Sequence, residues 1–141
     1  MQRRTRRHGM LLQQPWARLV AEGVFPVLLR SMSTTVRGQV AVVARGVDER
    51  ALVDGHEPDS KMFPQPALVG YVEIVNCLRI ARRNVGPVLR RHFGRAFQKF
   101  YPKHYIPAQG PIFFWVLGSP KLLIHPKKVE LPHGRRVWIW L

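Results

Sequence analysis

The chain has 141 residues, of which 46% are hydrophobic. That length and composition suit one folded domain with a core and exclude a disordered chain. Lys and Arg total 23 against 8 Asp and Glu, so the net charge of +15 favours polyanions such as RNA as partners. A single cysteine, Cys77, excludes an intrachain disulfide and a cysteine-rich zinc site, and it fits a reducing, cytoplasmic compartment.

The basic N-terminus, residues 1–9, is expected to be a solvated tail ahead of a single domain over residues 10–141. Its alternative role is an arm that binds a nucleic-acid backbone. The apolar stretch Met10–Leu12 is shorter than the core of a secretory signal, and the run Ile112–Leu117 is too short to cross a membrane. The histidines lack zinc-site spacing and no glycine-rich nucleotide loop occurs, so we expect no membrane, metal or cofactor.

The first half of the chain predicts one short helix and three strands. The helix spans residues 15–22, with Pro15 at its first position and Gly23 at its end. Residues 24–29 predict a strand, which Pro26 places at a sheet edge because proline cannot donate to the ladder. Further strands are expected at 40–43 and 67–78, with a surface excursion over 46–66 between them.

The second half predicts a longer helix over residues 87–101. Leu89, Phe93 and Phe97 share its apolar face, and the opposite face carries Arg90, Arg91, Arg95 and Lys99. Three more strands are expected within 111–117, 122–131 and 136–141, with turns at 118–120 and 132–134. Five or six short strands with two or more packed helices favour an α+β fold in which the sheet closes into a small β-barrel.

Four stretches in order along the chain resemble the ASCH family (activating signal cointegrator homology), a branch of the PUA-like folds. They are Gln14–Ala17 continuing through Gly23–Arg30, then Arg37–Gly38, Gly70–Cys77 and Gly110–Leu117. The resemblance covers most of the chain. It implies a PUA-like β-barrel with a cleft between the first helix and the strand after Gly23, and this cleft is thought to bind RNA or a nucleobase-like ligand.

Some ASCH proteins are amidohydrolases that act on acetylated cytidine, and this activity needs a Lys and a Thr in the cleft. Here those two positions hold Phe25 and Leu28, whose side chains cannot act as base or nucleophile, while the Arg of the pattern is kept as Arg30. The resemblance therefore implies an RNA-binding domain without catalysis. The alternative is a hydrolase that acts on a modified nucleoside or RNA in the same cleft, with Arg30 and Glu73 as its polar groups.

The candidate RNA-binding residues are of three kinds. The polar residues from Arg30 to Arg37 supply guanidiniums and hydroxyls that can bind phosphate. The basic helix face lies in a stretch that has no acidic residue from Ile74 to Val129. The ring of Trp16 either stacks on a base or packs in the core. The residues are Trp16, Arg30, Ser33, Thr34, Arg37, Arg90, Arg91, Arg95 and Lys99. A monomer is expected; an adaptor in a ribonucleoprotein, docking through exposed Trp138 and Trp140, is a further alternative.

Overall fold

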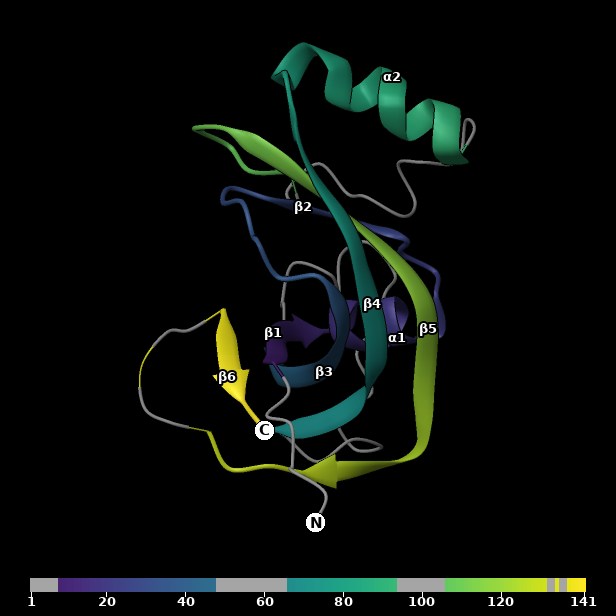
Figure 1. Ribbon diagram of the computed structural model, residues 1–141, viewed down its shortest axis with the longest axis vertical. Coiled ribbons are helices and arrows are strands. Elements are labelled where there is room, and N and C mark those ends of the chain that lie inside the picture. Colours follow the sequence, from purple (N-terminus) through teal and green to yellow (C-terminus); the bar gives the residue numbers. More distant parts are fainter. Residues whose placement is uncertain (1–7, 48–65, 94–105, 132–133, 135–136) are drawn as a thin grey trace.

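The computed structural model describes residues 8–47, 66–93, 106–131, 134 and 137–141 (Figure 1). These residues form, in chain order, β1 (His8–Gln14), α1 (Trp16–Glu22), β2 (Val27–Arg30), β3 (Gly38–Val47), β4 (Ala67–Ile80), α2 (Arg82–Phe93), β5 (Ile112–Lys128) and β6 (Trp138–Trp140). Strands and helices are mixed along the chain, so the predicted α+β class is confirmed. Within this part of the chain, no helix has both the length and the apolar character to cross a membrane.

The strands form one mixed sheet in the order β2-β5-β4-β3-β1-β6. β1 runs parallel to β3, and the other neighbouring pairs are antiparallel. The sheet curls into a half-barrel, and α2 lies beyond one end of it, where β4 leads the chain away from the barrel (Figure 1). The predicted small PUA-like barrel is confirmed in this form, and β2 lies at a sheet edge as Pro26 predicts.

Alternation along β1 divides its side chains between two apolar clusters. Met10 and Leu12 belong to the main core, which also contains the buried residues of α1. Leu11 belongs to a second cluster on the opposite face of the sheet, where Leu123 and Leu131 pack against it. Both faces of β1 are therefore covered, as is usual for a strand in a parallel pair.

The short helix α1 ends at the predicted residue. Gly23 adopts the left-handed conformation with φ of 84°, and its N–H donates to the carbonyl oxygen of Val20 at 3.1 Å. The next N–H, from Val24, donates to the carbonyl oxygen of Leu19 at 2.9 Å. Two carbonyl groups of the last turn are thus satisfied before the chain enters β2.

Strand β1 was not predicted, and it begins inside the expected N-terminal tail. His8 already pairs with Trp140 of β6, and Gly9 pairs with Ala41 of β3. The apolar part of this strand is only Met10–Leu12, which is too short to indicate a strand without its partners. Residues 1–7 of the expected tail lie outside the described residues.

The turn predicted at residues 118–120 is wrong, because β5 continues through it from Ile112 to Lys128. The ladder shifts register there: Tyr71 of β4 lies opposite Lys121, whereas Glu73 lies opposite Gly118. β5 thus has one more residue than β4 in this interval, and Ser119 takes a φ of 47°. These residues form a bulge, which bends and twists a long strand without ending it.

Helix α2 starts at Arg82, so the prediction that it begins at Pro87 is wrong. The apolar stripe extends one turn before the proline: Val85 and Leu89, four residues apart, are both buried. Burial of Val85 supports the extra turn despite the proline inside the helix. Leu89 is fully buried as predicted, whereas the side chain of Phe93 and all of residues 94–105, including Phe97, lie outside the described residues.

Gly70 gives a test of how β4, β5 and α1 pack. A Cβ atom at this position would lie 2.1 Å from the backbone oxygen of Lys121 and 2.8 Å from Cβ of Ala21. We expect Gly70→Ala to lower the free energy of unfolding by about 3 kcal/mol or to prevent folding, because backbone must move. Urea denaturation followed by circular dichroism measures this.

The matched control is Gly86→Ala, because a Cβ atom at Gly86 in α2 would meet nothing within 4 Å apart from its chain neighbours. Alanine favours the helix but its Cβ crowds the ring of Pro87, so these effects oppose one another and the change should cost less than Gly70→Ala, about 1 kcal/mol or less. Equal destabilisation by the two substitutions would contradict the described packing of Gly70.

Candidate functional site

Arg30 ends the edge strand β2 and lies over an aromatic ring of the neighbouring strand. Its Cζ atom is 5.0 Å from the ring centroid of Trp115, which is fully buried. The indole Nε1 of Trp115 donates a hydrogen bond of 2.9 Å to the backbone oxygen of Met32. Trp115 also stacks on Trp138 of β6, with centroids 5.6 Å apart and planes 8° from parallel. We call Arg30, Trp115 and Trp138 the indole stack.

The loop after Arg30 is ordered by its own short-range hydrogen bonds. The hydroxyl of Thr34 accepts from the backbone N–H of Val36 at 3.1 Å. The guanidinium of Arg37 donates to the backbone oxygens of Thr34 and Val36 at 3.0 and 2.9 Å. Ser33 and Arg37 are exposed, and Thr34 is half-buried. These three predicted residues therefore lie close to Arg30 in one small loop.

Strand register places a second arginine beside Arg30. Arg30 lies opposite Phe113 of β5, and Phe113 lies opposite Arg79 of β4. Residues that face one another in antiparallel strands point to the same side of the sheet, and two strand spacings separate the Cα atoms of the arginines by about 10 Å. Arg79 is exposed. We call Arg30, Phe113 and Arg79 the arginine row.

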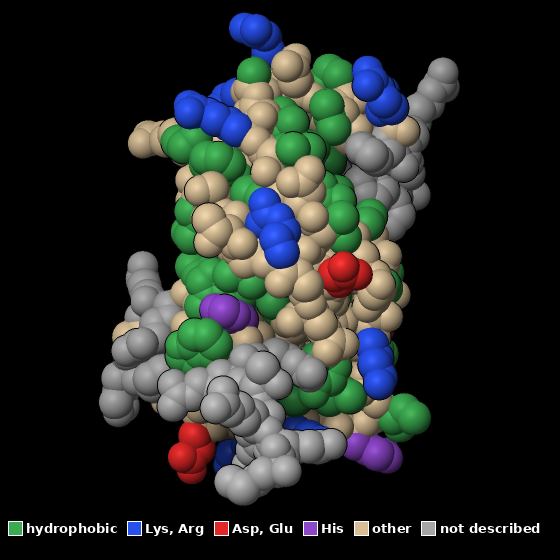
Figure 2. Space-filling model, in the orientation of Figure 1, with side chains coloured by type: hydrophobic (Ala, Val, Ile, Leu, Met, Phe, Trp, Pro, Cys, Tyr) green, Lys and Arg blue, Asp and Glu red, His purple; other side chains and the backbone are tan. Residues whose placement is uncertain are grey.

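Helix α2 continues the cationic surface from the end of β4. Arg82 donates to the backbone oxygens of Pro107 and Gly110 at 2.6 and 3.1 Å, which ties the start of the helix to the segment before β5. Arg83, Arg90 and Arg91 are exposed. Figure 2 shows blue Lys and Arg side chains at the α2 end of the molecule and no red side chain at that end of this face.

The acidic side chains that the structure describes lie elsewhere. Glu22 forms an ion pair with Arg18 within α1. Glu73 of β4, the acid of the hydrolase alternative, accepts a hydrogen bond of 3.3 Å from the hydroxyl of Ser119. Glu130 follows β5. Neither the arginine row nor helix α2 contains an Asp or Glu residue that could neutralise its arginines.

Three positions of the sequence pattern lie in the core. Trp16 is 2% exposed and its ring stacks on Phe25, with centroids 5.3 Å apart. Trp16 therefore packs in the core, which is one of the two roles considered for it, and its buried ring presents no face to a base. Phe25 and Leu28 are also buried, so hydrocarbon fills the positions at which the resemblance expects Lys and Thr.

The other predicted residues divide between two places and one undescribed segment. Arg30, Ser33, Thr34 and Arg37 lie together at the end of β2, and Arg90 and Arg91 lie on α2. Arg95 and Lys99 lie outside the described residues. Within the described ranges, no three His, Cys, Asp or Glu side chains are placed to hold a metal ion.

The sequence does not single out Trp115, and it indicates Arg79 only as part of the cationic stretch that continues the basic helix face. Arg79 is part of the stretch without acids, but its place beside Arg30 depends on the β4–β5 register. Trp115 lies in an apolar run that predicts only a buried strand. Their roles follow from pairings between distant segments, for which a single sequence carries little local signal.

Comparison with solved structures identifies the fold. The crystal structure of ASCH from Zymomonas mobilis matches with a TM-score of 0.59 and 10% sequence identity, covering 96% of this chain and 87% of that one. A mutant of the same protein with Phe in place of one Tyr matches with a TM-score of 0.57 and 11% identity, covering 97% of this chain and 91% of that one. A second mutant, with Ala in place of one Ser, gives a TM-score of 0.57 at 10% identity, with coverage of 96% and 87%.

The chain has the fold of an ASCH domain. No protein-family model and no curated protein sequence matches it. At this level of sequence identity, the likeness shows the fold and assigns no role to the side chains of the site.

Arg82 gives a test of how α2 is held. Arg82→Gln removes the charged donor to the carbonyl groups of Pro107 and Gly110, and we expect unfolding free energy to fall by about 1 kcal/mol. Amide hydrogens of α2 should exchange faster with solvent, as measured by mass spectrometry. Arg83→Gln makes the same charge change at an exposed neighbour and should have a smaller effect; the reverse order would contradict the tie described here.

Proposed function

We propose that the ASCH domain of this chain binds RNA as a monomer and without catalysis. In this proposal the RNA backbone lies along the arginine row and the exposed arginines of α2. The arginine row is the observation that carries it, because strand register joins the kept Arg of the family pattern to the basic end of β4. The resemblance to the ASCH family selects RNA from among the polyanions that a charge of +15 favours.

Guanidinium groups suit this role for a geometric reason. Arg stays charged and presents a rigid fork of donors that fits the oxygens of a phosphate. Arg30 and Arg79 are about 10 Å apart at Cα, and α2 begins at Arg82, so successive phosphates of one chain can meet successive guanidiniums. Backbone contacts of this kind position a nucleic acid without reading its sequence.

Binding without catalysis is supported by Phe25 and Leu28, which lie in the core. Hydrolysis of an acetylated base needs a group that takes up a proton and a group that attacks or polarises the carbonyl. Phe25 is 1% exposed and Leu28 is fully buried, and both carry hydrocarbon side chains. The chain thus keeps a charged group that can hold a ligand and lacks the reactive pair of the amidohydrolase pattern.

The main test reverses two charges on α2. We expect Arg90→Glu with Arg91→Glu to weaken binding to all RNA sequences alike and to reduce the dependence of affinity on salt, since fewer counterions are released. Fluorescence anisotropy with several labelled RNAs over a range of salt concentrations measures both effects.

The matched control reverses the charges of Lys127 and Lys128, which are exposed at the far end of β5. Lys127→Glu with Lys128→Glu changes the net charge by the same amount and should weaken binding less. Equal losses from the two pairs would mean that net charge alone governs binding, and a loss confined to one RNA sequence would contradict backbone contact.

Arg30→Lys tests the arginine row itself. The ammonium keeps the charge but loses the planar fork, so we expect RNA affinity to fall by about 1–2 kcal/mol, a factor of roughly 5 to 30. Thermal unfolding should be measured on the same variant, because Arg30 also lies over Trp115. Unchanged affinity with a lowered melting temperature would show that Arg30 stabilises the fold and does not contact RNA.

A further inference from the structure

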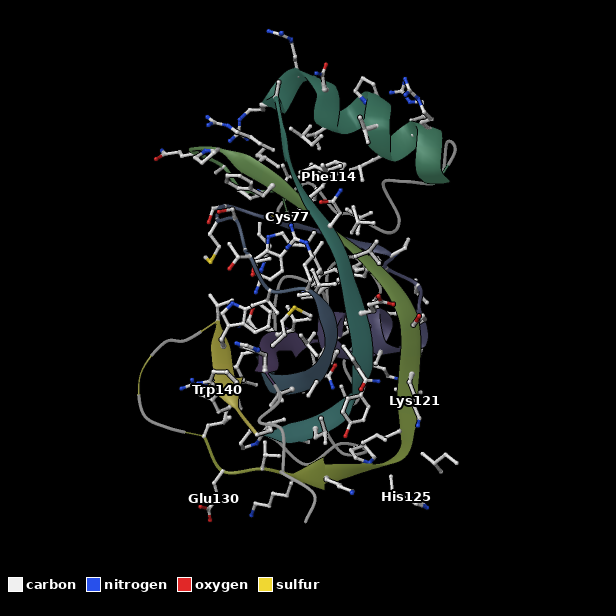
Figure 3. The ribbon with its side chains drawn as sticks, viewed as in Figure 1. Cys77, Phe114, Lys121, His125, Glu130 and Trp140 are labelled. Carbon is white, nitrogen blue, oxygen red and sulfur yellow. The ribbon has the colours of Figure 1, made fainter. Side chains whose placement is uncertain are left out.

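An aromatic cluster lies where β1 meets β6, and the function proposed above does not use it. The ring of His8 is 4.2 Å from the ring of Trp140, centroid to centroid, with 38° between the planes. The same imidazole meets the ring of Trp138 edge-on, at 5.5 Å and 75°. Figure 3 places Trp140 on β6, on the opposite side of the view from Lys121 of β5.

The pairing of β1 with β6 fixes this cluster. His8 lies opposite Trp140, and Met10 lies opposite Trp138. Side chains two residues apart in a strand share a face, so both indoles lie on the face of Met10, while Ile139 between them turns to the second apolar cluster. Trp138 is half-buried against the main core and Trp140 is 57% exposed. The cluster therefore leads outward from the core and ends in an exposed ring.

The chemistry of this cluster fits a flat aromatic ligand that accompanies negative charge. Indole rings stack on nucleobases of any sequence. The imidazole of His8 packs against the indole of Trp140. The sequence places four arginines within the seven residues before His8, and the whole chain has a charge of +15. A nucleic acid supplies both a base that can stack on the indole and phosphates that can meet the arginines.

The cluster is also continuous with the indole stack. Trp138 contacts His8 on one side of β6 and Trp115 within the core, and Trp115 in turn lies under Arg30. The exposed ring and the arginine row are thus parts of one connected set of planar groups.

We propose that Trp140, supported by His8, is a stacking platform for an unpaired nucleobase, so that the domain prefers single-stranded to double-stranded RNA. The inference rests on the proposed function and adds the form of RNA that is bound. A base inside a duplex is already stacked on both faces, so it can reach the indole only if the duplex frays or the base is extruded. An unpaired base has a free face to offer.

Affinity for two RNAs tests the platform. The probes are a 12-nucleotide oligouridine and a blunt duplex of the same length, with polyphosphate as an anion that has no bases. We expect Trp140→Ala to lower affinity for the oligouridine roughly 5-fold to 100-fold and to leave affinity for the duplex and for polyphosphate unchanged. Intrinsic tryptophan fluorescence should fall when the oligouridine binds, and this fall should shrink in Trp140→Phe.

Two control variants separate stacking from other effects. Trp140→Phe keeps a flat ring and should retain most of the affinity for the oligouridine. Ile124→Ala removes an apolar side chain that is 89% exposed elsewhere on the surface, and it should change nothing. Thermal unfolding of each variant shows whether the fold is intact.

The outcomes distinguish this inference from the proposed function. If the unchanged chain binds none of the RNAs, the proposed function fails and the platform fails with it. If the chain binds RNA but Trp140→Ala affects the single strand and the duplex equally, or affects neither, the platform alone is overturned. Loss of a co-purifying protein in Trp140→Ala, with oligouridine binding intact, would assign the ring to protein docking and would also overturn it.

Discussion

The indole ring of Trp115 connects the two edges of the sheet. It lies on β5 beside the edge strand β2, where Arg30 lies over it, and it stacks on Trp138 of β6 at the other edge. In the described sheet no ladder of hydrogen bonds joins β2 to β6, so side chains must hold the edges together. The ring is fully buried and its nitrogen anchors the loop through Met32. Arg30, the loop after it and β6 therefore all contact this ring.

Much of this fold could be predicted from local patterns. The cap at Gly23, the edge position of β2 and the burial of Leu89 each follow from one residue type and its neighbours. Features that depend on distant segments could not be predicted. β1 is a strand because β3 and β6 pair with it, and the bulge at Ser119 exists because β4 continues beside it.

The candidate site divides in the same way. Arg30 and its loop could be found from the family pattern and from residue type, whereas Arg79 joins them only through strand register. The role of Trp16 could not be predicted from its residue type, because an indole can either stack on a base or pack in the core. In this chain the ring that packs against Trp16 is that of Phe25, which stands at the Lys position of the family pattern.

Three arginines in the described part of the chain donate hydrogen bonds to backbone carbonyl oxygens. Arg82 binds the backbone of Pro107 and Gly110, Arg37 binds its own loop, and Arg45 donates to the carbonyl oxygen of Gly134 at 2.7 Å. A carbonyl group orients a guanidinium without cancelling its charge, so the folded domain retains the mutual repulsion of its cations. Counterions relieve that repulsion, and the same counterions would compete with RNA bound as proposed above. Added salt is therefore expected to stabilise the fold and to weaken the proposed binding.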